Sequence, residues 1–336
     1  MKKILFILKK RSLYSEAVYT TVNSGLYNSA TFVNNMLVKN GVDSNLVQVI
    51  DNNEIDKYCA QYKPDVVIIE ALWVVPSKFE ILQKLHPNIT WIIRLHSELP
   101  FLANEGVAIE WLKEYVKYEN VIIGANSKYL IEALSPYLKS KIVYLPNYYP
   151  VTNNIRFNFE CDKNNINVGL FGAIRPMKNS LTQAVAAINY AESVGKKLTL
   201  HINSARIEQK GENGLKNLRA LFVDSKHELV EHGWLAHEEF TELVSKMDIC
   251  MQVSLTETYN IVAADAVNVS TPIVTTKEIT FVNCISRVDS NKDVNNMIDK
   301  IRITLALKPL LVVVNKILLK IDSHKSKNNW LFFAKK

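Results

Sequence analysis

The chain has 336 residues, of which 48% are hydrophobic and 22% charged, a balance that excludes disordered and collagen-like proteins. Because single hydrophobic cores stop growing at about 250–300 residues, this length predicts two domains. The formal net charge of +7 lies mostly near the C-terminus, where residues 304–336 hold seven lysines and one acidic residue, Asp322.

The cysteine spacing and the apolar runs argue against several other classes of protein. The four cysteines lie far apart and form no Cys-x-x-Cys pair, which disfavours a disulfide framework or a zinc site and favours a reducing, cytoplasmic location. The N-terminal "MKKILFILKKRS" has an apolar core of five residues, which is too short for a signal peptide and predicts a buried first strand. No run reaches the roughly 18 apolar residues that a membrane span needs.

The first 150 residues alternate short apolar runs with longer amphipathic segments. The apolar runs predict strands over residues 3–8, 44–50, 65–71, 90–95, 120–125 and 141–146. The amphipathic segments predict helices over residues 29–41, 54–63, 79–86, 108–118 and 128–138. Apolar strands that alternate with helices are typical of a parallel sheet covered on both faces, so residues 1–150 are expected to form a doubly wound, Rossmann-like α/β domain.

A change in composition marks the expected domain boundary. Residues 151–165, "VTNNIRFNFECDKNN", are rich in Asn and charge and are interpreted as a linker. The alternation then resumes, with predicted strands over 166–173, 197–203, 228–234, 248–254 and 272–276 and predicted helices over 181–196, 215–225, 238–247 and 261–269. Residues 166–305 are therefore expected to form a second Rossmann-like domain, which faces the first across a cleft.

The C-terminal residues predict one further helix and a tail. Apolar residues at positions 310, 311, 313, 314, 317, 318 and 321 follow the spacing of one helix face, with Lys316 and Lys320 on the other. Residues 306–322 are therefore expected to form an amphipathic helix. Residues 323–336, which end in "KSKNNWLFFAKK", are expected to form a basic aromatic tail.

The segment "VGLFGAIRPMKN", residues 168–179, follows a predicted strand. Ligands of open parallel sheets bind beyond the carboxyl ends of the strands, so residues placed there are the first candidates for a site. Gly172, Arg175 and Lys178 lie here, just before a helix that starts near Ser180. A helix start exposes unpaired N–H groups and a positive dipole end, so two adjacent cations favour a diphosphate. A solvated loop with incidental charges is the alternative interpretation.

A second candidate segment, "SLTETYNIVAADAVNVSTPIV", covers residues 254–274 and follows another predicted strand. Glu257 lies in its loop, and Asp265 lies in about the second turn of a short helix that ends before Pro272. Both carboxylates are expected to project towards the cleft, where they suit the vicinal hydroxyls of a sugar or a ribose. The alternative is that Glu257 complements the helix dipole and that Asp265 is a surface charge.

These two segments, in this order and about 80 residues apart, resemble the C-terminal domain of GT-B glycosyltransferases, particularly those of the family 4 type. The family pattern of a Glu, seven residues, a second Glu and then Gly-Thr-Pro is similar to "TETYNIVAADAVNVSTP". In the first half, "RLHSELPF", "GANSKYLIEAL" and "IVYLPNYYP" resemble segments of the same family. The resemblance covers roughly residues 1–290 and implies a GT-B fold, in which the helix at 306–322 crosses back to the first domain.

The resemblance also implies a role for each candidate residue. Arg175 and Lys178 would neutralise the diphosphate of a UDP- or GDP-linked sugar donor, and Asp265 would hold its ribose. Glu257 and His96 are the catalytic candidates: Glu257 would hold the transferred sugar, and His96 follows the predicted strand 90–95, where the family places a His beside that sugar. The donor-binding candidates are Gly25, Gly172, Arg175, Lys178, Thr258, Tyr259, Asn260, Ile261 and Asp265.

The implied reaction is a retaining glycosyl transfer that needs no metal and no other cofactor, because fixed cations at a helix start can stabilise a departing diphosphate. Some positions depart from the family pattern. Asp265 replaces a Glu, Ser270 replaces a Gly, Thr258 and Asn260 stand where glycines are usual, and Gly25 stands where the first loop often has two glycines. A sugar-nucleotide 2-epimerase and a non-catalytic nucleotide-sugar or nucleic-acid binding module are the alternative functions.

The acceptor is expected to bind the first domain. Residues 66–106 resemble glycosyltransferases encoded by bacterial viruses, some of which modify hydroxymethylated DNA. The expected acceptor is therefore such DNA, in a host cytoplasm, or else a lipid or glycan. The lysines and aromatic residues of the tail, Trp330, Phe332 and Phe333, suit a peripheral membrane contact, and the same lysines would also suit DNA phosphates.

Overall fold

The computed structural model describes residues 1–10, 25–155 and 162–336. The chain divides into two compact units, one of Met1–Pro150 with Ser323–Lys336 and one of Val151–Asp322. Each unit contains one sheet in which every strand runs parallel to its neighbours. The expected class, α/β with two parallel sheets, is confirmed.

The sheet of the first unit has six strands in the order β2-β1-β3-β4-β5-β6. They are β1 (Ile4–Lys9), β2 (Ser44–Val49), β3 (Val66–Glu70), β4 (Thr90–Leu95), β5 (Val121–Ala125) and β6 (Ile142–Tyr144). The helices are α1 (Gly25–Lys39), α2 (Glu54–Tyr62), α3 (Lys78–Leu85), α4 (Leu99–Leu102), α5 (Ala108–Tyr115) and α6 (Lys128–Leu134). Every strand and helix predicted here is present within a few residues of its expected bounds, and α4 is additional.

Alternate residues of the central strands lie in two separate cores. Leu5 and Ile7 of β1 pack in a core that contains residues of α2, α3, α5 and α6. Ile4 and Phe6, which point to the other face, pack in a core that contains residues of α1 and of the last turns of the C-terminal helix. A strand buried on both faces needs an apolar residue at every position, which explains the continuous apolar runs in the sequence.

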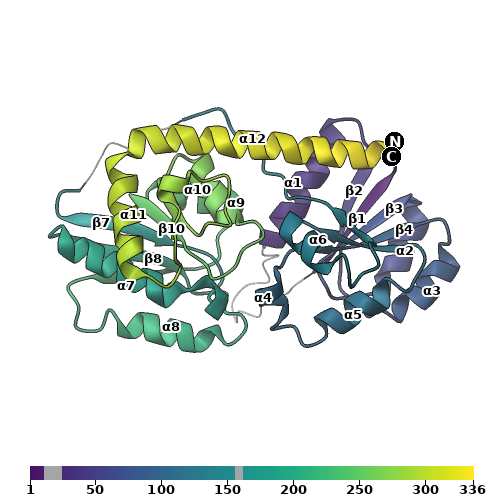
Figure 1. The fold of residues 1–336 in the computed structure, drawn as a ribbon, viewed down its shortest axis with the longest axis horizontal. Helices are drawn as coiled ribbons and strands as arrows, with labels where there is room; N and C mark the ends of the chain where they lie inside the picture. The colour runs from purple at the N-terminus through teal and green to yellow at the C-terminus, as the bar shows by residue number, and fades with distance from the viewer. Residues whose placement is uncertain (11–24, 156–161) are drawn as a thin grey trace. The chain divides into compact units, whose positions relative to one another are not determined.

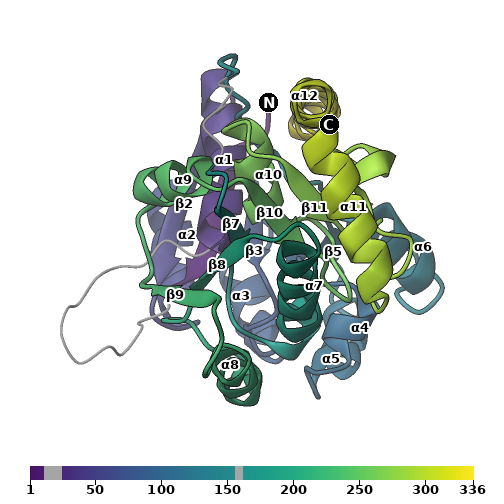
Figure 2. The same ribbon diagram turned by 90° about the vertical axis from the view of Figure 1, so that its left-hand side faces the viewer.

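The sheet of the second unit has five strands in the order β11-β10-β7-β8-β9. They are β7 (Asn165–Leu170), β8 (Lys197–Asn203), β9 (Glu228–His232), β10 (Ile249–Gln252) and β11 (Ile273–Thr275). The helices are η1 (Pro176–Lys178), α7 (Ser180–Ser193), α8 (Gly211–Ala220), α9 (His237–Ser245), α10 (Ile261–Asn268), η2 (Cys284–Ser286) and α11 (Val294–Ala306). In Figure 2, α9 and α10 lie on one face of this sheet and α7 and α11 on the other. Helix α11 and the two short 3-10 helices, η1 and η2, were not predicted.

The strand order of the second unit identifies the place where a ligand is expected. The chain runs outwards from β7 through β8 to β9 and then returns to β10, on the other side of β7. The order therefore reverses between β7 and β10. In open parallel sheets, ligands bind beyond the carboxyl ends of the two strands at such a reversal, because their loops lead to opposite faces of the sheet.

Helix α12 (Lys308–Lys335) corrects the expectation of a separate tail. It is a single helix (Figure 1, yellow), so residues 323–335 continue it. Its last turns belong to the first unit, where Trp330 is fully buried against Phe6 and donates from Nε1 to the carbonyl oxygen of Pro146 at 2.7 Å. Because Trp330 is buried in the core, the expectation that it inserts into a membrane interface is wrong.

Helix α12 also packs through a different face from the expected one. Asn315 and Lys316 are buried, and Lys316 Nζ donates to two backbone carbonyl oxygens of the second unit. Leu310, Ile317 and Ile321 are exposed. Much of the apolar face predicted from the spacing therefore lies on the outside of the helix. Within the described ranges, no helix has the combination of length and apolarity that a membrane span needs.

Replacement of Trp330 by Ala is expected to lower the free energy of unfolding by about 3–5 kcal/mol, because a fully buried aromatic side chain leaves a cavity. Phe332→Ala is the matched control, since Phe332 lies two residues away and is 60% exposed; we expect it to change the free energy by less than about 0.5 kcal/mol. Urea unfolding followed by circular dichroism measures both. Equal effects of the two substitutions would contradict the burial of the helix end.

Candidate active site

The loop after β7 presents two cations beside the start of helix α7. Gly172 has a φ of +117°, which residues with a side chain rarely adopt. After η1, Asn179 forms the N-cap of α7 in a left-handed conformation. Arg175 and Lys178 therefore stand next to the first turn of α7. The first N–H groups of a helix have no partner within it, and the positive end of its dipole favours an anion.

The loop after β10 presents Glu257 in a fixed orientation. Asn260 caps α10 by accepting a hydrogen bond from the N–H of Ala263 at 2.9 Å, and its Nδ2 donates to Gln252 at 2.8 Å and to Glu257 Oε1 at 3.1 Å. Ser254 Oγ donates to the same oxygen of Glu257 at 2.7 Å. The carboxylate is therefore held by its own loop before any ligand binds.

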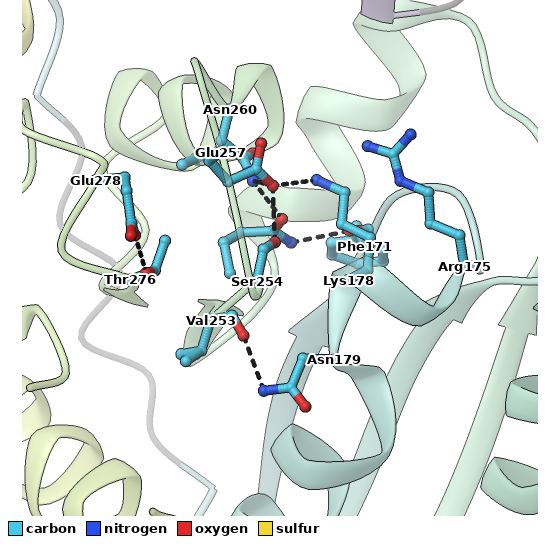
Figure 3. A network of polar contacts seen from close by, with 12 residues as sticks. Phe171, Arg175, Lys178, Asn179, Val253, Ser254, Glu257, Asn260, Thr276 and Glu278 are labelled. Atoms are coloured by element: carbon cyan, nitrogen blue, oxygen red, sulfur yellow. Dashed lines mark hydrogen bonds and ion pairs between the residues drawn. The ribbon is translucent and has the colours of Figure 1, made fainter. Parts of the chain in front are cut away.

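The two loops meet in an ion pair between Lys178 and Glu257. The distance from Lys178 Nζ to Glu257 Oε1 is 2.5 Å, although the residues are 79 positions apart (Figure 3). The two side chains are 16% and 8% exposed. Burial lowers the pKa of Lys178, and the Glu257 carboxylate opposes this shift. The Glu257 carboxylate thus favours the charged form of Lys178, as any anion bound beside it would.

Further hydrogen bonds fix the two loops to each other. The N–H of Val253 donates to Gln183 Oε1 at 2.7 Å, and Asn179 Nδ2 donates to the carbonyl oxygen of Val253 at 3.1 Å. The N–H of Leu255 donates to the carbonyl oxygen of Met177 at 2.9 Å. Charges held by such loops need little reorganisation when a ligand binds. Asn179 and Gln183 were not predicted, because amide side chains at a helix start are common in all proteins.

Arg175 lies at the edge of this cluster with a second arginine. Its Nη1 is 3.4 Å from Glu208 Oε2, and Arg206 Nη2 is 2.5 Å from the other oxygen of Glu208. The guanidinium of Arg206 also stacks 5.1 Å from the ring centroid of Trp234. In Figure 3 the charged ends of Arg175 and Lys178 lie on the same side of their loop. Arg206 is therefore a third cation near the site, in addition to the two predicted from the sequence.

The position of the loop that carries Arg175 depends on Gly211. Residues 174 and 206–208 run side by side: the N–H of Ile174 donates to the carbonyl oxygen of Arg206, and the N–H of Glu208 donates to that of Ile174, both at 2.9 Å. A Cβ atom at position 211 would lie 2.1 Å from the carbonyl oxygen of Ile174. Only glycine therefore allows α8 to start so close to the loop that carries Arg175.

Asp265 lies in the second turn of α10 as expected, but it is buried and paired. Its Oδ1 is 2.8 Å from Nε2 of His237, the first residue of α9, and its side chain is 2% exposed. The hydrogen bond to Asp265 raises the pKa of His237. The interpretation of Asp265 as a surface charge is therefore wrong. His237 was missed because a partner 28 residues away leaves no local pattern.

The remaining donor candidates lie around these loops or in the other unit. Thr258 and Tyr259 continue the loop that carries Glu257, and Ile261 is the first residue of α10. The ring of Tyr259 packs 5.1 Å from the ring of Phe281. Gly25 is the first residue of α1, so it belongs to the first unit, whereas the other donor candidates belong to the second.

The first unit carries a separate polar cluster around His96. His96 follows β4, and its Nε2 is hydrogen-bonded to the carboxylate of Glu70, the last residue of β3. Glu70 is fully buried and also accepts from Arg94 Nη1 at 3.0 and 3.2 Å. The other N–H groups of Arg94 donate to the segment 145–147. All hydrogen-bonding groups of this buried arginine side chain are thus used.

The charges of this cluster determine the state of His96. Burial raises the pKa of Glu70, but Arg94 and His96 outweigh it and hold the pKa below its usual value. Burial and the charge of Arg94 lower the pKa of His96, and Glu70 opposes them. Glu70 is thus an ionised acceptor, so a neutral His96 must carry its proton on Nε2. Glu70 and Arg94 were missed, although a charged residue within an otherwise apolar strand was a signal.

No protein-family model and no curated protein matches this chain. Solved structures do match over nearly all of it. Sucrose-phosphate synthase from Thermosynechococcus elongatus has a TM-score of 0.66 and 14% identity, covering 95% of this chain and 94% of that chain. HepE from Anabaena, in complex with UDP and glucose, has a TM-score of 0.66 and 12% identity, covering 100% and 99%.

A third match is an alpha-glucosyltransferase in complex with UDP and a 13-mer DNA containing an HMU base. It has a TM-score of 0.59 and 13% identity, covering 97% of this chain and 93% of that chain. These neighbours are glycosyltransferases of the GT-B fold. Because the sequence identities are 14% or lower, these matches show similarity of fold alone. This chain has the GT-B fold, as its sequence predicted.

His237→Gln is expected to destabilise the protein most at low pH. Because the folded pKa of His237 is raised above its ordinary value of 6.5, the stabilisation is fully present below that value and is lost as the pH rises through the raised pKa. We expect a difference from wild type of about 1–3 kcal/mol near pH 6, and a smaller one near pH 9. Urea unfolding at both pH values measures it. A difference that increases with pH would contradict the pairing with Asp265.

Proposed function

We propose that the protein is a glycosyltransferase that moves a sugar from a nucleoside-diphosphate sugar to an acceptor hydroxyl, with retention at the anomeric carbon and without a metal ion. The observation that carries the proposal is the meeting of Lys178 and Glu257 at the point where the strand order of the second unit reverses. The UDP bound in two of the fold neighbours supports the choice of a nucleoside-diphosphate donor.

In this proposal the donor diphosphate lies at the start of α7. When the bond between the anomeric carbon and the diphosphate oxygen breaks, negative charge builds up on that oxygen. Arg175, Lys178 and the first N–H groups of α7 stabilise that charge, which is the role that a metal ion has in other transferases. The diphosphate also competes with Glu257 for Lys178. The carboxylate of Glu257 then becomes an acceptor for the hydroxyls of the transferred sugar.

The cluster of the first unit would supply His96 to the reaction. A neutral imidazole can hydrogen-bond to a sugar hydroxyl or accept a proton near neutral pH. Glu70 would act as a positioning residue, since it fixes both the orientation and the tautomer of His96. Arg94 keeps Glu70 ionised and in place.

One assay separates the proposed reaction from its two alternatives. Incubation with labelled UDP- and GDP-sugars would give slow release of the nucleoside diphosphate and of the unchanged sugar, as expected for a transferase that lacks its acceptor. An epimerised sugar would indicate a 2-epimerase, and binding without turnover would indicate a binding module. Unchanged rates in a metal chelator are expected, and loss of activity would contradict the metal-independent mechanism.

Hydroxymethylated DNA and a lipid or glycan hydroxyl are the acceptors to compare. The resemblance of residues 66–106 to viral enzymes supports the DNA acceptor, and so does the fold neighbour that was solved with DNA. Mass spectrometry of nucleosides detects a sugar on DNA, and transfer of label into lipid or glycan extracts detects the other class. The anomeric configuration of the product, read by NMR, tests retention.

Lys178→Ala is expected to lower turnover of the donor by about 10²–10³-fold, because it removes one preorganised charge that stabilises the leaving group. Lys197→Ala is the control: Lys197 pairs with Glu228 on the exposed surface, so turnover should change by less than about twofold. Initial rates of nucleoside-diphosphate release measure the effect, and circular dichroism checks the fold. Undiminished turnover in Lys178→Ala would contradict the proposed site.

Glu70→Gln is expected to move the acid limb of the pH–rate profile to lower pH. The substitution removes the charge that opposes the lowered pKa of His96, so that pKa falls further, and the active neutral form persists to lower pH. We also expect kcat to fall by about 10–100-fold, since His96 loses its orientation. Glu80→Gln, on the exposed side of α3, is the control. A lower kcat with an unmoved acid limb would assign Glu70 a structural role only.

A further inference from the structure

Helix α12 exposes an apolar stripe. Leu310, Ile317 and Ile321 are 58%, 51% and 46% exposed. Residues four and seven positions apart lie on the same side of a helix, so these three form one stripe. The buried side of the same helix includes Asn315 and Lys316. Leu311, Val312 and Leu319 are buried on that side too, so the helix packs through a mixed side and carries a second apolar side that faces outwards.

Lysines border the stripe on both sides. By helical spacing, Lys320 and Lys327 lie along one edge and Lys325 along the other, and Lys320 and Lys325 are exposed. The only acidic residue after Asp299 is Asp322, which lies outside the stripe and is half-buried. The outer face of α12, defined as the stripe with these lysines, is thus apolar along its centre and positive along its edges.

We propose that the outer face of α12 binds the surface of a membrane that contains anionic lipids. The helix would lie in the plane of the interface, with its aliphatic side chains at the boundary between headgroups and acyl chains. The lysine ammonium groups would contact the anionic headgroups, while their methylene stems extend the apolar surface. The stripe from Leu310 to Ile321 is about 16 Å long at the rise of an α-helix.

The charge pattern favours anionic lipids over two other occupants. A nucleic acid would contact the lysines, but its phosphates have no use for three exposed aliphatic side chains. A second copy of the chain, bound through the same face, would bring the lysine edges of both copies together, and like charges repel. A lipid surface complements both features at once. This inference is independent of the proposed transferase reaction.

Sedimentation of the full-length protein with vesicles tests the inference. The vesicles contain phosphatidylcholine, either alone or mixed with phosphatidylglycerol. The test variant is Ile317→Gln/Ile321→Gln. The control is Ile81→Gln/Ile109→Gln, which removes two isoleucines of similar exposure, 52% and 47%, from the first unit. Three further measurements are made on the same samples. They are the release of nucleoside diphosphate from the donor, the oligomeric state by size-exclusion chromatography with light scattering, and the binding of duplex DNA by mobility shift.

We expect binding to the phosphatidylglycerol vesicles that weakens about tenfold or more in Ile317→Gln/Ile321→Gln, because two aliphatic side chains no longer enter the interface. The control variant Ile81→Gln/Ile109→Gln should bind the phosphatidylglycerol vesicles as well as wild type does. The wild-type protein should bind little to vesicles of pure phosphatidylcholine. Lys320→Gln/Lys325→Gln should also weaken binding. Equal behaviour of the two isoleucine pairs would overturn the proposal. DNA binding that is lost only in the lysine variant would also overturn it, because it would indicate a nucleic acid as the occupant. A dimer that dissociates in Ile317→Gln/Ile321→Gln would overturn it as well, because it would indicate a second copy of the chain. Turnover should be unchanged in all variants, since none of these residues lies in the proposed site.

Discussion

The ion pair between Lys178 and Glu257 is the contact on which the candidate site depends. A buried ion pair contributes little to stability by itself, because desolvation of the two charges offsets their attraction. Here the carboxylate also accepts hydrogen bonds from Ser254 and Asn260, so its loop is folded around the charge. The pair thereby fixes the loop after β7 to the loop after β10 in one arrangement. If an anionic ligand took the place of the carboxylate beside Lys178, Lys178 would keep an anionic partner and Glu257 would keep its hydrogen bonds from Ser254 and Asn260.

The same physical rule accounts for the polar cluster of the first unit. Glu70 ends β3, and the strand order of that sheet reverses between β1 and β3. Buried charges are costly, so they persist where they are paired and where their arrangement has a use. Glu70 is hydrogen-bonded to both Arg94 and His96, which orients His96, and burial and the charge of Arg94 lower the pKa of its imidazole. Each unit thus has one cluster of paired charges at the carboxyl ends of strands next to a strand-order reversal.

Much of the fold could be predicted from the sequence because it follows from local patterns. The strands of both sheets were predicted because two-sided burial demands uninterrupted apolar runs, as in Ile4–Leu8. Helix α11 was missed, although Val294, Met297 and Ile301 have helical spacing. Ser270 stands where the glycosyltransferase family that the sequence resembles has glycine, and it adopts a positive φ of 70°, a conformation that glycine adopts more readily.

What could not be predicted depends on contacts between distant segments. Spacing identified α12 as amphipathic but could not show which side packs, because Lys316 is buried by carbonyl oxygens of residues 154 and 268. The partner of Asp265 and the ion pair of Glu257 are likewise set by the strand order. His237, whose partner lies 28 residues away, carries little signal in a single sequence, whereas Glu70 and Arg94 stand out as charged residues in apolar strands.

Calorimetric titration with nucleotides measures whether the second unit binds a diphosphate beside Lys178. If Lys178, Arg175 and the start of α7 form a diphosphate site, UDP or GDP should bind about tenfold or more tightly than the corresponding monophosphate, and Lys178→Ala should remove that difference. Equal affinities for mono- and diphosphates in the wild-type protein, or a preference that survives in Lys178→Ala, would contradict the account.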